Sequence, residues 1–432
     1  MFETAVLTLC LAGVAVAGGC GETSIPTVTD RASNTLATST PRAAVATAAR
    51  PSGSATGAGG NGHIRTPPLA RMLGQMIVTR FAGTRPSATL LTRIRAGQVG
   101  GVILFSDNLA GGPASTRAMT AELQSAATAG GNPPLLIMTD QEGGTVRRLY
   151  WAPPSISAAA MGSTATAHAQ GQAAGIALHA VGINLDLAPV ADVLRVSGSF
   201  LGSRSFGVSA TVVAERACAF ATGLGYAGVG FTLKHFPGLG RALASTDSQA
   251  VTISGSAAAL RSDYGAYHAC GAQPNAIVMI SSAAYPSLTG TSLPAVMSPE
   301  IYRDELPTAT HVQPLTISDD LQTPAVLAHA HPARRGIEAG LDLLMYAQSE
   351  AGSITAYRQL LALAQEKAIG SARIREAYEA IALYKQFLLE HGTAAGAGAG
   401  ASEAIEAGSK SEEAPLAPAE GVGTPTTIKA TG

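Results

Sequence analysis

The chain has 432 residues, of which 46% are hydrophobic and 13% are charged, and its formal net charge is −1. A chain of this length and hydrophobicity can bury a large core. Its near-neutral charge gives no electrostatic reason to expect nucleic acid or an acidic membrane surface as a partner. The four cysteines show neither a CxxC pair nor a paired Cys/His spacing, so no zinc site is predicted.

The first twenty residues contain an apolar run that ends in small residues just before Cys20. This run is short for a membrane span and has the length of a signal peptide. Two interpretations stay open. Either AGGC is a degenerate lipobox in which Cys20 is acylated, or the leader is an ordinary cleaved signal. We favour the lipoprotein, whose lipid would hold the mature protein on the outer face of a membrane.

Low-complexity sequence lies on both sides of a patterned central region. Residues 21–66 are rich in Ser, Thr, Ala and Pro and are expected to form a flexible tether. Residues 393–432 have a similar composition and are expected to be disordered. The central region, 67–392, has the length of one large α/β domain. An exported protein could also form a disulfide between Cys218 and Cys270.

Short apolar runs alternate with helical patterns along the central region. The apolar runs are GQMIVTRF, GGVILFSDN, PLLIMTDQEGG, GINLDLAPVADV, VGFTLKHFPG, NAIVMISS, QPLTISDDL and GLDLLMY. Most of them lack strict alternation, as expected of strands buried on both faces. Helical patterns such as 86–97 and 210–225 lie between them and often end in Gly. The alternation predicts a closed parallel (β/α)8 barrel.

Charged residues stand where several of these apolar runs end. They are Asp140 on one run, Asp186 and Asp192 on a second, Lys234 and His235 on a third, and Asp319 and Asp320 on a fourth. In a parallel barrel, the loops at these strand ends build the active site. Any single residue could be a turn cap or a satisfied core histidine. Four strands that deliver charge to one rim predict an active site.

Six blocks carry a resemblance to a known family. In chain order they are GGVILFSDN, TDQEGGTVRRL, GINLDLAPVADV, GSRSFG, KHFPG and SDDL. Over roughly residues 70–350 the chain resembles glycoside hydrolase family 3, in particular its single-barrel β-N-acetylglucosaminidases. The resemblance implies a (β/α)8 TIM-type barrel as the single catalytic domain of a retaining β-glycosidase. It implies no metal or other cofactor, and a substrate with terminal β-N-acetylglucosamine on an oligosaccharide or muropeptide.

The resemblance also assigns residues to roles. Asp319 matches the nucleophile, whose carboxylate attacks the anomeric carbon and forms a covalent glycosyl-enzyme. The sugar-binding residues of the family match Asp140, Arg148, Arg204, Lys234 and His235. A carboxylate accepts paired hydrogen bonds from vicinal hydroxyls, and cations donate to the remaining oxygens. Asp320 is the weaker nucleophile candidate, because adjacent strand residues face opposite ways.

The loop that carries the general acid departs from the family pattern. The family uses a histidine two residues after an aspartate; here Asp247 matches the aspartate, but Gln249 stands in place of the histidine. Asp247 itself, or an acid or histidine from another loop, such as His329 or His331, could protonate the leaving group. Alternatively, the substrate needs little protonation, or the chain is a sugar-binding surface protein that has lost catalysis. We expect an active, divergent enzyme that works outside the cytoplasm.

Overall fold

The computed structural model describes residues 67–398. The leader with Cys20, the predicted tether and residues 399–432 lie outside the described residues. Within the described part of the chain, no helix is both long enough and apolar enough to cross a bilayer. The helix that ends this part continues to Gly398, past the boundary that low-complexity sequence suggested at residue 392.

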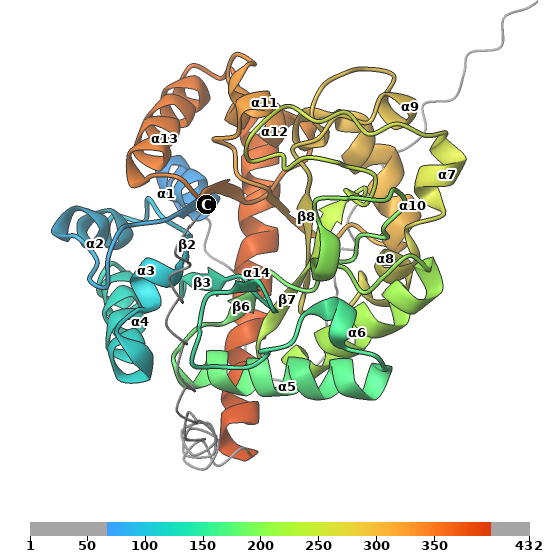
Figure 1. Ribbon diagram of the computed structural model, residues 1–432. Coiled ribbons are helices and arrows are strands. Elements are labelled where there is room, and N and C mark those ends of the chain that lie inside the picture. Colours follow the sequence, from blue (N-terminus) through green and yellow to red (C-terminus); the bar gives the residue numbers. More distant parts are fainter. Residues whose placement is uncertain (1–66, 399–432) are drawn as a thin grey trace, which may run out of the picture. The chain divides into compact units, whose positions relative to one another are not determined.

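The centre of the domain is an eight-stranded parallel barrel (Figure 1). Its strands are β1 (Ile77–Thr79), β2 (Gly101–Ile103), β3 (Leu136–Thr139), β6 (Leu185–Asp186), β7 (Gly230–Phe236), β8 (Ala276–Ile280), β9 (Leu315–Ser318) and β10 (Leu344–Tyr346). Each pairs with its neighbour in chain order, and β10 also pairs with β1. Hydrogen bonds from Ser318 N to Leu343 O and from Leu343 N to Thr316 O, both 2.9 Å, join β9 to the β10 segment. The predicted barrel fold is therefore confirmed.

Helices follow the strands and pack around the barrel. They are α1 (Leu69–Gln75), α2 (Ala88–Arg95), α3 (Ser106–Leu109), α4 (Gly112–Ala129), α5 (Thr164–Ala180), α6 (Ala210–Tyr226), α7 (Ala257–Arg261), α8 (Gly265–Cys270), α9 (Pro286–Thr289), α10 (Leu306–Thr310), α11 (Pro324–Leu327), α12 (Pro332–Ala339), α13 (Glu350–Gln365) and α14 (Ser371–Gly398). A two-stranded hairpin of β4 (Gln141–Gly143) and β5 (Val146–Arg147) stands beyond the end of β3. All eight predicted apolar runs contain a barrel strand.

Serine residues fix where several helices begin. The Oγ atoms of Ser87, Ser163 and Ser209 accept hydrogen bonds from the backbone N–H three residues later, at 3.0, 3.0 and 3.4 Å. Each bond satisfies one of the N–H groups that a helix start leaves without a partner. The sequence therefore marks the entry from loop to helix after the barrel strands.

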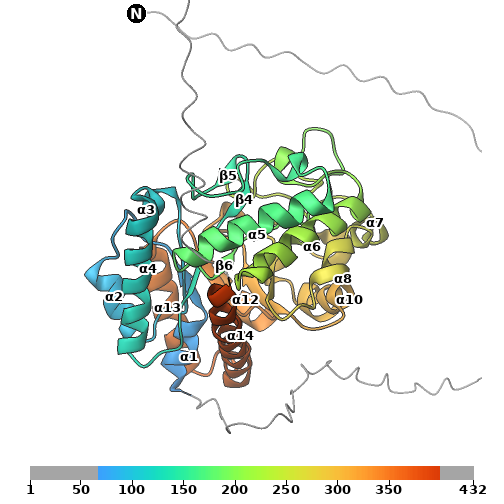
Figure 2. The ribbon, with the colours of Figure 1, turned by 90° about the horizontal axis from the view of Figure 1, so that it is seen from below.

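Helices α5 and α6 pack closely because α5 carries glycine on the facing side. A side chain at Gly171 would place its Cβ 2.1 Å from the carbonyl oxygen of Phe220, which is closer than atoms can approach. Figure 2 shows the two helices side by side. On its other side, α6 is linked to α8 by a disulfide between Cys218 and Cys270, whose Cα atoms are 5.7 Å apart.

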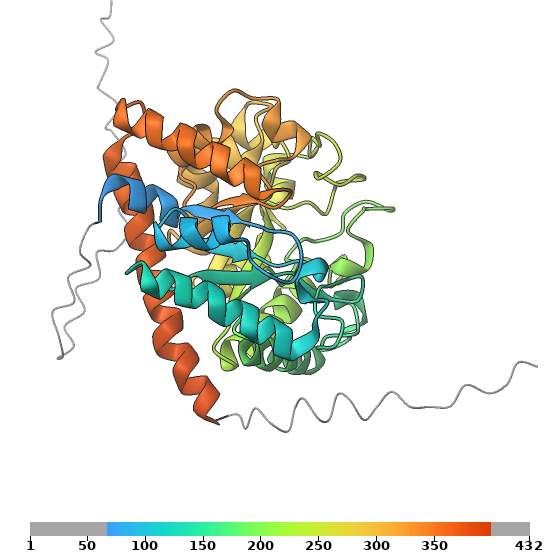
Figure 3. The same cartoon turned by 90° about the vertical axis from the view of Figure 1, so that its left-hand side faces the viewer.

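Helix α14 covers the end of the barrel at which the strands begin. Tyr384 donates its hydroxyl to the carbonyl of Asn275, just before β8, at 2.9 Å. Lys385 donates from Nζ to the carbonyl of Gly100, just before β2, at 2.8 Å. Figure 3 shows α14 crossing this end of the strands, opposite the loops that follow them. Those loops are thus left to form a site at the other end.

Candidate active site

A cavity of about 360 Å³ opens among the loops that follow the barrel strands. Its charged and titratable lining residues are Asp140, Arg148, Arg204, Lys234, His235, Asp247, Asp319 and Asp320. Asp140 follows β3 directly, Lys234 and His235 lie in β7, and Asp319 follows β9. The structure therefore brings together all seven catalytic and sugar-binding candidates that the sequence placed in the barrel.

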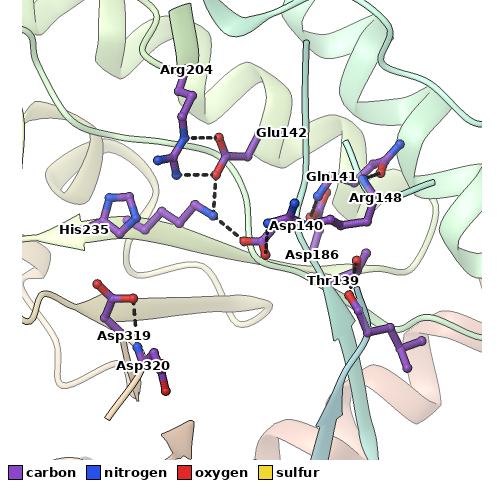
Figure 4. A network of polar contacts seen from close by, with 12 residues as sticks. Thr139, Asp140, Gln141, Glu142, Arg148, Asp186, Arg204, His235, Asp319 and Asp320 are labelled. Atoms are coloured by element: carbon purple, nitrogen blue, oxygen red, sulfur yellow. Dashed lines mark hydrogen bonds and ion pairs between the residues drawn. The ribbon is translucent and has the colours of Figure 1, made fainter. Parts of the chain in front are cut away.

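One side of the cavity is a cluster of compensated charges. Lys234 Nζ lies 2.7 Å from Asp140 Oδ1 and 2.6 Å from Glu142 Oε1. Arg204 donates two hydrogen bonds to Glu142, both at 2.8 Å, and dashed lines in Figure 4 mark this fork. Arg148 completes the cluster 3.6 Å from Asp140 Oδ2. Such paired, hydrogen-bonded charges can stay ionised although they are buried.

The pKa values of the cluster follow from this pairing. Burial by itself would raise the pKa of Glu142, but Lys234 and Arg204 lower it to about 2. Burial likewise opposes the effect of Lys234 and Arg148 on Asp140, whose pKa is lowered overall. Burial would lower the pKa of Lys234, and the two carboxylates raise it instead. The cluster therefore presents fixed charges to a ligand at neutral pH.

Glu142 is the member of this cluster that sequence reasoning missed. Its side chain is 2% exposed and accepts bonds from both Arg204 and Lys234. Its neighbour Gln141 turns the other way, and its Oε1 accepts hydrogen bonds from the backbone N–H groups of Arg148 and Leu149, both at 3.0 Å. The only sequence signal was an acidic residue inside the DQEGG block, next to a candidate already chosen.

His235 is held in one orientation by Asp192. The imidazole Nδ1 lies 2.8 Å from Asp192 Oδ2, and the same carboxylate accepts backbone hydrogen bonds from His235 and Leu239. Asp192 is 1% exposed and is not part of the cavity lining, so its place at a strand end serves to orient His235. The hydrogen bond at Nδ1 leaves Nε2 as the ring nitrogen available to a ligand.

Asp186 is a second strand-end aspartate that does not reach the cavity. It is fully buried, and its Oδ1 accepts a hydrogen bond from Gln141 N at 2.9 Å. Burial raises the pKa of Asp186 to about 8, so this carboxyl group is mostly protonated at neutral pH. It supports the segment after β3 and is not available to a ligand.

Asp319 lies on the side of the cavity away from the charged cluster (Figure 4). Its Oδ1 accepts a hydrogen bond from Asp320 N at 2.9 Å, and its Oδ2 accepts one from Thr246 Oγ1 at 3.4 Å. Burial raises the pKa of Asp319, nearby His235 lowers it, and Asp247 raises it further. Asp319 lines the cavity, and its two hydrogen-bond donors favour its ionised form.

Asp320 also lines the cavity, which corrects the expectation that it faces the opposite way from Asp319. The chain leaves β9 at Ser318, so the alternation of a strand no longer applies to these two residues. Asp320 Oδ1 accepts hydrogen bonds from the backbone N–H groups of Gln322 and Ala347, at 3.1 and 3.0 Å. Asp320 thereby ties the β9 loop to the β10 loop.

The candidates for the general acid separate clearly in space. Asp247 lines the cavity, and its Oδ2 accepts a hydrogen bond from Ser245 Oγ at 3.1 Å. Gln249, two residues later, is exposed and does not line the cavity. His329 and His331 are also absent from its lining. Of the three proton donors named from the sequence, only Asp247 lines the cavity.

Comparisons with known proteins agree with this geometry. The profile of the glycosyl hydrolase family 3 N-terminal domain matches residues 69–383. An uncharacterized secreted glycosyl hydrolase of Arthroderma benhamiae is 34% identical over 289 residues, which are 64% of this chain and 81% of that protein. A β-hexosaminidase of Xanthomonas campestris is 38% identical over 181 residues, 40% of this chain, so the match spans about half (53%) of that enzyme.

A solved structure resembles the chain in the same way. The family 3 β-N-acetylglucosaminidase from Paenibacillus sp. superposes with a TM-score of 0.72 at 28% identity, covering 80% of this chain and 68% of that one. The family profile covers well over half of the chain, and the barrel agrees with the fold of the solved structure. The chain therefore belongs to glycosyl hydrolase family 3 and is a glycoside hydrolase.

Proposed function

We propose that the protein is a retaining β-hexosaminidase that removes terminal β-N-acetylglucosamine, or a related β-linked sugar, from cell-wall-type oligosaccharides. The observation that carries this proposal is that Asp319 and Asp247, from different loops, line one cavity with the charged cluster around Lys234. The names β-hexosaminidase and β-N-acetylglucosaminidase, borne by two of the similar proteins, support the choice of sugar.

The proposed reaction has two steps at the anomeric carbon. The Asp319 carboxylate attacks this carbon while its bond to the leaving oxygen breaks, and the carboxylic acid of Asp247 gives its proton to that oxygen. The product of this step is a glycosyl ester on Asp319. A water molecule then attacks the same carbon and passes a proton to the Asp247 carboxylate, which releases the sugar and restores both groups.

The charged cluster would hold the sugar during both steps. Asp140 accepts hydrogen bonds from sugar hydroxyls, while Arg148, Arg204, Lys234 and His235 donate to sugar oxygens. Because salt bridges already fix these side chains, a sugar can bind without a large cost for ordering them. We assign Glu142 to positioning Lys234 and Arg204, since it contacts both and does not line the cavity.

The location of the enzyme is part of the proposal. The apolar leader of the sequence supports export, and Cys20 would carry the lipid if the leader is a lipoprotein signal. The related hydrolase of Arthroderma benhamiae is named as secreted, which agrees with an extracytoplasmic enzyme. An oligosaccharide or muropeptide outside the cytoplasm would then be the substrate.

The alternative is a sugar-binding surface protein with impaired catalysis. Gln249 favours this alternative, because an amide cannot replace the imidazole that protonates the leaving group in the family. An aryl N-acetyl-β-glucosaminide with an activated leaving group separates the two functions, since it bypasses the acid. Tight sugar binding without turnover of this substrate would favour the binding protein.

The nucleophile gives the decisive test of the proposed enzyme. We expect turnover of the activated aryl glycoside, and a loss of about 10³-fold or more in kcat for Asp319→Ala. A fluorinated glycoside that traps the covalent intermediate should label Asp319, as mass spectrometry of the digested protein would reveal. Labelling of another residue, or unchanged activity of the variant, would refute the proposed mechanism.

A further inference from the structure

The loop that carries Asp247 touches the proposed nucleophile directly. Between Ser245 and Ala250 only Thr246 is buried: it is 3% exposed, whereas Asp247, Ser248, Gln249 and Ala250 are all exposed. Thr246 also lines the cavity, and its Oγ1 donates a hydrogen bond to Asp319 Oδ2 at 3.4 Å. A buried threonine in an otherwise exposed turn is held there by what it contacts.

The turn around Thr246 is ordered by its own hydrogen bonds. Ser245 Oγ accepts a hydrogen bond from Asp247 N at 3.2 Å and donates one to Asp247 Oδ2 at 3.1 Å. Ser248 Oγ donates to the carbonyl of Ser245 at 3.0 Å. Serine side chains commonly close turns in this way. The position of the Asp247 carboxylate is therefore tied, through two residues, to the contact between Thr246 and Asp319.

We propose that Thr246 is a positioning residue that couples the Asp247 loop to the Asp319 carboxylate. Its hydroxyl donates to the ionised nucleophile and at the same time anchors the turn that presents the general acid. This inference rests on the proposed function and adds a residue to which neither the family pattern nor the sequence pointed.

The ionisation of Asp319 is the readout that a merely structural threonine would not change. His235 from β7, Asp247 from the loop, the adjacent Asp320 and Tyr285 from the segment after β8 all act on this carboxyl group. If these groups stay unchanged, loss of the Thr246 hydroxyl, which donates to the ionised carboxylate, should raise the pKa of Asp319 by about half a unit to one unit.

Thr246→Val keeps the shape of the side chain and removes the hydroxyl, and Thr246→Ser restores the hydroxyl. We expect Thr246→Val to lower kcat/KM for the activated aryl glycoside about tenfold and to move the acidic limb of its pH profile to higher pH. Thr246→Ser should recover most of both effects. Gln249→Ala, which shortens an exposed side chain in the same loop outside the cavity, is the control and should leave both quantities unchanged.

A second measurement does not depend on catalysis. In the full chain labelled with ¹³C-aspartate, the NMR titration of Asp319, assigned with Asp319→Asn, should shift upward in Thr246→Val and remain near wild type in Thr246→Ser. If the wild type hydrolyses nothing but this shift occurs, the proposed function fails and the positioning role stands. If the titration and the pH profile are the same in Thr246→Val as in the wild type, Thr246 does not position Asp319.

Discussion

The pKa values of carboxyl groups are shifted in opposite directions on the two sides of the cavity. On one side, Lys234 and Arg148 lower the pKa of Asp140 in spite of its burial. Lys234 and Arg204 do the same for Glu142. On the other side, burial raises the pKa values of Asp319 and Asp320, and Asp247 adds to both shifts. One side therefore offers fixed charge for binding, while the raised pKa values on the other side are those of Asp319 and Asp320.

The role of Asp247 can be tested with leaving groups of different acidity. Asp247→Asn should lower kcat about 10²-fold or more for an unactivated N-acetylglucosamine disaccharide, because the amide cannot donate a proton. For a dinitrophenyl glycoside, whose leaving group needs no proton, cleavage of the glycosidic bond should slow much less. Burst kinetics would separate that step from hydrolysis of the intermediate, which also needs Asp247.

Gln249 supplies the matched variant for this experiment. Because Gln249 is exposed and lies outside the cavity lining, Gln249→His should change the rate on the disaccharide less than about threefold. A large gain in Gln249→His, or equal losses of both substrates in Asp247→Asn, would mean that the loop takes another position when substrate binds and that Asp247 is not the acid.

At the scale of residues, the sequence located candidates at the carboxyl ends of barrel strands. These ends lie on one rim of the barrel, whatever path the loops take. The sequence did not identify Glu142 or Thr246. The β4–β5 hairpin decides whether Glu142 or its neighbour Gln141 faces the charged cluster, and nothing in the sequence distinguished the two. Thr246 depends on the path of a loop, which no periodicity reports.

At the scale of elements, the apolar runs located every barrel strand, because parallel strands buried on both faces need continuous apolar sequence. Helices with amphipathic patterns, such as α2 and α6, were located as well. Helix α5 was not, since Ala and Gly dominate it and leave little hydrophobic periodicity. Its glycines make physical sense only beside α6, where Gly171 meets the backbone of Phe220.

The disulfide between α6 and α8 should stabilise the fold without affecting the chemistry. It closes a loop with a sequence separation of 52, so its removal in Cys218→Ser/Cys270→Ser should lower the free energy of unfolding by about 4 kcal/mol. Neither cysteine lines the cavity, so kcat on the activated glycoside should stay within about twofold of wild type below the melting temperature. Denaturant unfolding with and without reductant measures the first effect, and unchanged stability under reduction would contradict it.

At the scale of the whole barrel, the two ends have different roles: one carries the candidate site, and helix α14 covers the other. The loops after the strands carry the charged site, whereas α14 crosses the end where the strands begin. There Lys385 is 3% exposed and donates hydrogen bonds to Gln75 Oε1 at 2.7 Å and to Gly100 O at 2.8 Å. Both acceptors are neutral, and burial lowers the pKa of Lys385 to about 7. Among the residues that the structure describes, no carboxylate is paired with Lys385, which lies at the end of the barrel opposite the candidate site.

The consequence for stability follows from proton linkage. The pKa of Lys385 is lower in the folded chain than in the unfolded chain, so the unfolded chain binds more protons between these two values. Stability should therefore rise with pH above about 7, by up to about 1.4 kcal/mol per pH unit. Two kinds of group limit the pH range in which this rise can be measured. Asp186, with a pKa of about 8, lowers stability as pH rises towards that value, and buried tyrosines such as Tyr384, whose pKa burial raises, lower it only above about pH 10.

Urea unfolding from about pH 8 to 9.5 isolates the contribution of Lys385. The wild type should gain free energy of unfolding across this range, whereas Lys385→Met, which keeps the length of the side chain and removes the charge, should show little change. The difference between the two proteins at each pH cancels the other titrating groups. Parallel curves would show that the two hydrogen bonds keep Lys385 charged inside the barrel, and that this end of the fold tolerates a buried ammonium without a pH-dependent cost.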